Sequence, residues 1–231
     1  MEHVEDVHLA RMRRNPSKIV REILDLVHSD LCGPMTVASL VGYHYYVTFI
    51  DDYSQKTWIY FLNNKESEEV LSRFKDFKAQ VENLLGKRIK ILRSNNGGEY
   101  TSTKLNDFYK EAGIKRELIV PYNPQQNGVA ERNNRTIVEA SKSMIHDHIL
   151  PMFLWAEASR TTVYVHNRCP HKIVNNMTPE EDFTVVKPEV GHHQFFGCPF
   201  YIHVPKEKRK NLEPSGKKVT FKDTVNLQRT T

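Results

Sequence analysis

The sequence is poor in cysteine and has no long apolar run. Its 231 residues include three cysteines, at positions 32, 169 and 198, and none of them belongs to a C-x-x-C pair. This spacing argues against a disulfide framework and favours a reducing compartment, nuclear or cytoplasmic. The sequence also lacks the apolar stretch of a secretory signal or of a membrane span, so we expect an intracellular protein with no membrane partner.

Composition favours one main domain and a polyanionic partner. Hydrophobic residues make up 39% of the chain, which is too many for a wholly disordered protein and enough for one substantial core. The formal net charge is +5. A basic surface of this kind favours nucleic acid as the partner, provided that the positive side chains cluster.

The residue pattern predicts an α/β fold. Three runs rich in β-branched and aromatic residues, 23–31, 43–50 and 56–62, predict an antiparallel meander with a turn at 51–54. Alternating helical and strand patterns follow, with helices at 67–85 and 102–112 and strands at 88–92 and 114–120. Together these segments predict a mixed five-stranded sheet flanked by helices.

The second half of the chain predicts further helices and a small β-like extension. Residues 121–128 read as a polar loop, 129–148 and 153–167 show helical spacing, and a short helix is expected from Thr178. Phe153 and Trp155 should be buried. We divide the chain into a charged leader (1–21), a core (22–190) and a truncated basic, β-like segment (191–231).

Polar groups at strand ends and in the following loops commonly form the site of such a sheet. Asp30 stands at the end of the first strand, Asn95 lies in the loop after the fourth, and Glu131 lies near the start of a later helix. Taken singly, each has a structural alternative. A strand-end aspartate often belongs to a turn, and a helix-start glutamate is favoured by the helix dipole.

Four segments together resemble the catalytic core of Copia-type long-terminal-repeat retrotransposon integrases. They are residues 28–34, residues 49–54, the loop around Asn95, and residues 121–132, and the resemblance extends over about residues 22–221. It implies a ribonuclease H-like fold. It also implies an enzyme that trims the ends of a retroelement DNA and joins them to target DNA.

The resemblance further implies a metal-binding triad of two aspartates and a glutamate that holds two Mg²⁺ or Mn²⁺ ions. Asp30 and Glu131 match the first and third positions. Asn95 stands where the family has the second aspartate, and the 35 residues between it and Glu131 match the family spacing. Losing this charge should lower metal occupancy and catalysis. Asp51, Asp52 and Glu99 are possible substitutes, although the aspartates fit a β-turn better.

The resemblance also implies a DNA-binding surface beside the triad. Its candidate residues are Tyr122, Asn123, Gln125, Gln126 and Asn127 in the polar loop, Arg132 and Arg135 on the next helix, and Lys208, Arg209 and Lys210 near the C-terminus. Arginine and amide side chains of this kind suit phosphates better than bases. The alternatives are a solvated connector and a solvated helix face.

Complete relatives carry an N-terminal zinc module with two histidines and two cysteines. Here His3 and His8 have no cysteine before Cys32, so no zinc site is expected. Three functions stay open: an integrase core that can form a homodimer, a DNA-binding or interaction module that has lost its chemistry, and a ribonuclease H-like nuclease acting on RNA.

Overall fold

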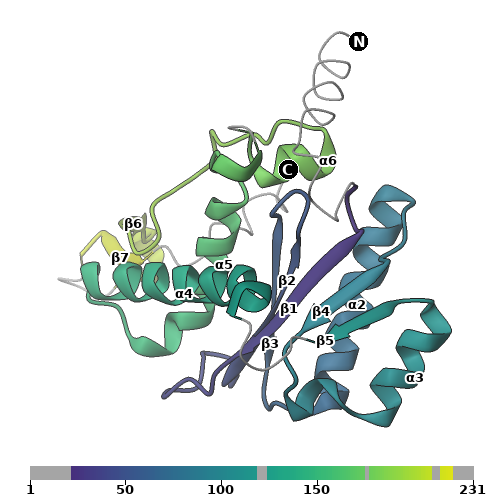
Figure 1. Cartoon of the computed structure of the whole chain (residues 1–231). Coiled ribbons are helices and arrows are strands. Elements are labelled where there is room, and N and C mark those ends of the chain that lie inside the picture. The colour runs from purple at the N-terminus through teal and green to yellow at the C-terminus, as the bar shows by residue number, and fades with distance from the viewer. Residues whose placement is uncertain (1–21, 119–123, 175–176, 210–213, 221–231) are drawn as a thin grey trace, which may run out of the picture.

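A five-stranded sheet forms the centre of the computed structural model, which describes residues 22–118, 124–174, 177–209 and 214–220 (Figure 1). The strands are β1 (Leu26–Cys32), β2 (Tyr45–Asp51), β3 (Thr57–Leu62), β4 (Ile91–Ser94) and β5 (Lys115–Leu118). Their order is β3-β2-β1-β4-β5. β1, β2 and β3 pair antiparallel, whereas β4 and β5 join β1 in parallel. The predicted mixed sheet is confirmed.

Helices cover both faces of this sheet. They are α2 (Ser67–Leu85), α3 (Thr103–Ala112), α4 (Pro124–Asp147), α5 (Trp155–His166) and the short α6 (Pro179–Thr184). In Figure 1, α2 and α3 lie on one side of the sheet, and α4 and α5 on the other. Within the described residues, short 3₁₀ turns complete the connections: η1 (Gly98–Tyr100), η2 (Met152–Leu154), η3 (Lys172–Val174) and η4 (Lys206–Lys208).

Alternation along the central strands produces the two cores. Phe49 of β2 packs with Phe74 and Phe77 of α2, and the ring centroids of Phe49 and Phe77 are 4.6 Å apart. Tyr46, three residues earlier, points to the other face and packs with Trp155 of α5. Successive strand residues face opposite ways, so one strand supplies both cores.

Several predicted boundaries are wrong, and the first strand begins at Leu26 rather than at residue 23. α4 begins at Pro124, inside the segment predicted as a polar loop. The first turn of a helix needs no apolar periodicity when it faces solvent, and proline is favoured there because its missing N–H would be unpaired anyway. The fourth strand is Ile91–Ser94 rather than 88–92, because Ile89 N donates to the Glu82 side chain (3.0 Å) instead of joining the sheet.

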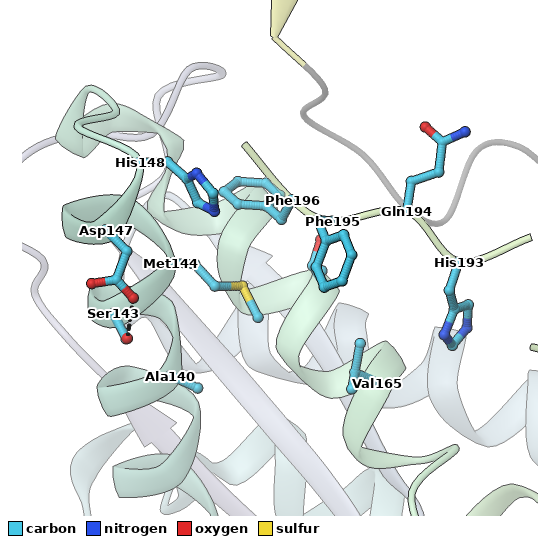
Figure 2. A pocket seen from close by; sticks show the side chains of 11 residues that line it. Ala140, Ser143, Met144, Asp147, His148, Val165, His193, Gln194, Phe195 and Phe196 are labelled. Carbon is cyan, nitrogen blue, oxygen red and sulfur yellow. Dashed lines mark hydrogen bonds between the residues drawn. The ribbon is translucent and has the colours of Figure 1, made fainter. Parts of the chain in front are cut away.

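The C-terminal segment forms a separate two-stranded sheet. Its strands, β6 (Pro199–His203) and β7 (Gly216–Thr220), pair antiparallel. β6 is shorter than the predicted run 195–204, because Phe195 and Phe196 lie before it and line a cavity of about 510 Å³ with α4 and α5 (Figure 2). Among the residues that the structure describes, no helix is long and apolar enough to cross a membrane.

We expect Trp155→Ala to destabilise the protein by about 3 to 5 kcal/mol, the range for removing a large buried aromatic side chain. Trp155 is 6% exposed, its Nε1 donates to Val37 O (2.9 Å), and its ring packs on Phe61. Thermal or urea unfolding measures the change. Ile149→Ala is the control, because Ile149 is 93% exposed. Equal melting temperatures for the two variants would contradict the packing role of Trp155.

Candidate functional site

The sheet brings Asp30 and Asn95 together. β1 and β4 are parallel neighbours in which Ser29 lies opposite Ser94, so the next residue of each chain segment emerges at the same end of the sheet. Asn95 Nδ2 donates to Asp30 Oδ1 at 3.1 Å. Residues 65 positions apart in sequence therefore share one hydrogen bond.

Asn134 of α4 holds the other oxygen of Asp30. Its Nδ2 donates to Asp30 Oδ2 (2.9 Å), and its Oδ1 accepts from the Thr48 hydroxyl (3.1 Å). The hydroxyl fixes which end of the amide faces the carboxylate. Asn134 is not among the candidate residues that the sequence pattern singles out. The available signal was its spacing of three residues from Glu131, which puts both on one helix face.

The Asp30 carboxylate lies in a poorly solvated position. Its side chain is only 9% exposed, and burial raises the pKa of Asp30 to about 6. The hydrogen bond from Asn134 opposes this rise, whereas the negative charges of Glu131 and Glu99 add to it. The two amide donors thus stabilise a carboxylate that burial destabilises.

Asn95 is turned so that its oxygen faces its own loop. Its Oδ1 accepts from Gly97 N (3.0 Å) while its Nδ2 faces Asp30. Rotating the amide by half a turn would place an oxygen against the carboxylate and an NH₂ against the N–H of Gly97. Both new contacts would be repulsive, so the hydrogen bonds fix the orientation.

Glu131 lies on α4 within electrostatic reach of Asp30. It is exposed, and its charge contributes to the raised pKa of Asp30. The sheet end and the helix thus bring all three residues singled out in the sequence into one region. Asp30 and Asn95 share a direct hydrogen bond, and the influence of Glu131 on Asp30 is electrostatic.

The aspartates of the β2–β3 turn serve the fold. Asp51 accepts hydrogen bonds from Leu24 N (2.8 Å), Ser54 N (2.8 Å) and Ser54 Oγ (2.7 Å). Asp52 Oδ1 contacts His28 Nε2 at 2.9 Å. The turn interpretation of this pair is confirmed.

Glu99 folds back over its own loop. Its carboxylate lies so close to Gly97 that a Cβ added there would collide with it. The next residue, Tyr100, is buried, and its hydroxyl contacts Ser29 Oγ of β1 at 2.7 Å. This contact ties the loop to the strand that carries Asp30, and nothing in the sequence pattern had singled out Ser29 or Tyr100.

Residues 24–124 match the family model described as integrase core domain. The chain carries an integrase core domain. It is 47% identical over 191 residues to the retrovirus-related Pol polyprotein from transposon TNT 1-94 of Nicotiana tabacum, a match covering 83% of this chain and 14% of that protein. It is 32% identical over 198 residues to the corresponding polyprotein from transposon RE2 of Arabidopsis thaliana, covering 86% and 13%. The resemblance to retrotransposon integrases is confirmed, and the chain spans a small part of these relatives.

Solved structures share the fold of this integrase core. The catalytic core domain of BIV integrase aligns with a TM-score of 0.53 at 19% identity, covering 69% of this chain and 93% of that one. A chain of the simian T-cell lymphotropic virus intasome in complex with PP2A regulatory subunit B56 gamma aligns with a TM-score of 0.59 at 16% identity, covering 90% and 74%. The expected ribonuclease H-like fold is therefore confirmed.

Integrase core domains use divalent metal ions, and the residues of this integrase core fit two such ions poorly. Hard cations need charged oxygens. Asp30 and Glu131 can supply them, but position 95 presents an amide N–H to Asp30 and gives its only oxygen to Gly97. Within residues 22–118, 124–174, 177–209 and 214–220, no three His, Cys, Asp or Glu side chains are grouped so that they could hold a metal ion. His3 and His8 lie outside these residues.

The candidate DNA-binding residues of the integrase core fall into two groups. Arg132 and Arg135 are exposed on α4, and Arg209 is partly exposed after η4. Three candidates lie outside the described residues: Tyr122, Asn123 and Lys210. Four are described only in their backbone: Gln125, Gln126 and Asn127 in the first turn of α4, and Lys208 at the end of η4. The structure thus places two of the ten candidate side chains on the helix that carries Glu131.

The raised pKa of Asp30 predicts a pH-dependent stability. Between the unfolded value of 3.8 and the folded value of about 6, the folded state binds more protons than the unfolded state. Relative to Asp30→Asn, the wild-type protein should therefore lose stability as the pH rises through this window, by up to about 3 kcal/mol. Urea unfolding at several pH values, with chelator present, tests this. Parallel pH profiles for the two proteins would contradict a raised pKa.

Proposed function

We propose that this integrase core belongs to a retrotransposon polyprotein, binds retroelement ends and target DNA, and is impaired in phosphoryl transfer by Asn95. The observation that carries the proposal is the pair of hydrogen bonds made by Asn95, which turn an N–H rather than an oxygen towards Asp30. The sequence match to retrotransposon polyproteins supports the DNA substrate.

The reaction of the family explains why one charge matters. Trimming uses water, and joining uses a 3′-hydroxyl, to attack a phosphodiester. Two divalent cations can stabilise the attacking and the leaving oxygens of such a displacement. Asp30 and Glu131 retain two of the three carboxylates for this purpose, and Asn95 carries no charge. We therefore expect weak metal binding and weak or absent joining.

A second function is a DNA-binding or interaction module without chemistry. It is favoured by the way both Asp30 oxygens are already occupied by amide donors, from Asn95 and Asn134. Such a network is satisfied without a cation. A nuclease acting on RNA is less well supported, since residues 24–124 match the family model described as integrase core domain.

The same proposal extends to the arrangement of the chain. We place the core at residues 22–190 and a basic β-like segment at 191–231, with residues 1–21 as a charged leader.

We also propose that the core forms a homodimer and that it acts in the nucleus or cytoplasm. Size-exclusion chromatography with light scattering tests the oligomeric state, and a monomer at all concentrations would contradict it.

Binding to duplex DNA should depend steeply on salt and little on base sequence. Arg132 and Arg135 are exposed, and phosphate contacts by such side chains release counterions. Each phosphate neutralised should contribute roughly −0.9 to the slope of log affinity against log salt concentration. Fluorescence anisotropy with two unrelated duplexes measures this. A flat plot, or no binding at low salt, would remove DNA from the partners.

Asn95→Asp should raise metal affinity and DNA joining together. The variant restores a carboxylate beside Asp30 and removes the amide donor that occupies Asp30 Oδ1. A short duplex with retrotransposon-like ends, with Mg²⁺ and then Mn²⁺, is the substrate for the wild type, Asn95→Asp, and Asn95→Asp with Glu131→Gln. Joining is expected only for the single variant.

The other outcomes of this comparison discriminate between causes. Equal activity in the wild type and in Asn95→Asp would show that position 95 needs no charge. Activity that survives Glu131→Gln would show that Glu131 is not a ligand. Calorimetric Mg²⁺ titration of the same three proteins separates a failure of metal binding from a failure of DNA joining.

A further inference from the structure

A second cavity, of about 220 Å³ and lined mostly by polar residues, lies along α4. Its α4 wall is made by Val129, Arg132, Asn133 and Thr136. These positions follow the spacing i, i+3, i+4, i+7, so they form one face of the helix. No predicted catalytic residue lines the cavity.

Consecutive residues of α4 take part in the cavity and in the Asp30 site. Asn134 turns its Nδ2 to Asp30, whereas its neighbour Asn133 donates from Nδ2 to Thr57 Oγ1 at the start of β3 (2.6 Å). Two consecutive residues of one helix therefore hold the two sites in a fixed relation.

Two histidines from the end of α5 and the turn after it line the cavity too. The ring centroids of His166 and His171 are 5.8 Å apart, in an edge-to-face arrangement. His171 Nδ1 is buried and has no hydrogen-bond partner among the described residues. Burial lowers the pKa of both imidazoles, and the proximity of His171 lowers the pKa of His166 further. A buried ring nitrogen without a partner costs free energy that a bound ligand could recover.

Arg132 supplies the positive charge. It is exposed on α4, and its guanidinium lies over Gly128, where an added Cβ would be 3.5 Å from Nη1. The guanidinium therefore packs against the helix at Gly128. A planar guanidinium with several N–H donors is well suited to phosphate oxygens.

The charges around the cavity favour an anion. Among the described residues that line it, none is a carboxylate. Gln55, which also lines it, donates from Nε2 to the main-chain oxygen of Asp52 (2.6 Å), but the Asp52 side chain is engaged by His28. Asn133 Oδ1 is a buried acceptor without a partner, and a water molecule bridging to the anion could satisfy it.

We infer that this cavity is a phosphate-binding site in which Arg132, His166 and His171 hold one backbone phosphate of the DNA that the Asp30 site binds. The inference rests on the proposed function, because a backbone phosphate requires that the chain binds DNA. The guanidinium supplies the charge, and the imidazoles supply N–H donors at the far wall.

Inorganic phosphate is the first probe. NMR of the full chain with labelled histidine, at constant ionic strength, should show saturable shifts of the His166 and His171 imidazole signals and none for His146, which is exposed on α4. Arg132→Gln should abolish these shifts. Lys142→Gln removes the same charge from another exposed position of α4 and should leave them unchanged. Absent shifts, or equal effects of the two variants, would overturn the site.

DNA is the second probe. His171→Gln changes no formal charge while the imidazole is neutral, so it should weaken duplex binding severalfold only if His171 contacts the DNA. His146→Gln is its matched control. Arg132→Gln should reduce the salt slope by about 1, the expectation for one lost phosphate contact. Melting curves of all variants check that each remains folded.

The two probes separate the possible failures. If the wild type binds no DNA, the proposed function fails, and with it the backbone phosphate. If the wild type binds DNA while His171→Gln and Arg132→Gln bind it with unchanged affinity and salt slope, the inference alone fails. If inorganic phosphate binds and DNA affinity is unaffected, the cavity serves free phosphate, and the assignment to DNA is overturned.

Discussion

The Asp30 carboxylate, held between two amide groups, is the interaction on which the rest of the site depends. One amide belongs to Asn95 in the loop after β4, and the other belongs to Asn134 of α4. The buried Asp30 side chain therefore connects β1 to that loop and to α4. Thr48 of β2 orients Asn134. Charge-assisted hydrogen bonds of this kind are stronger than neutral ones. The hydrogen bond from Asn134 opposes the burial that raises the pKa of Asp30.

This arrangement explains what asparagine at position 95 changes. A carboxylate there would face Asp30 across the distance now occupied by a hydrogen bond, and two like charges so close need a cation or a proton between them. With asparagine, the same contact is attractive without either. Stability of the site without a cation and affinity for metal thus oppose each other at this one position.

The sequence predicts much of the fold because local patterns and global topology agree. The meander and the following alternation lead to the observed sheet, and the turn residues Ser102 and Gly113 bound α3 as capping chemistry requires. The strand ends also predict that Asp30 and Asn95 approach each other. The start of α4 at Pro124 could not be predicted, since its polar first turn has no apolar periodicity.

Side-chain direction was harder to predict than position. Whether Asn134 faces Asp30 or solvent depends on the rotation of α4 about its axis, which packing against β1 and β2 decides. Glu99 was a plausible substitute by proximity in sequence; its carboxylate packs over Gly97, and its charge still raises the pKa of Asp30. The contacts of Thr57 were equally hard to predict from the sequence. Its backbone N–H and C=O form hydrogen bonds with the Asn167 side chain, and its hydroxyl accepts one from Asn133. One edge-strand residue thus fixes α4 and the end of α5 to the sheet. The two helices that line the second cavity, α4 and α5, are therefore held to the same sheet that positions Asp30. A substitution at Thr57 should disturb both sites.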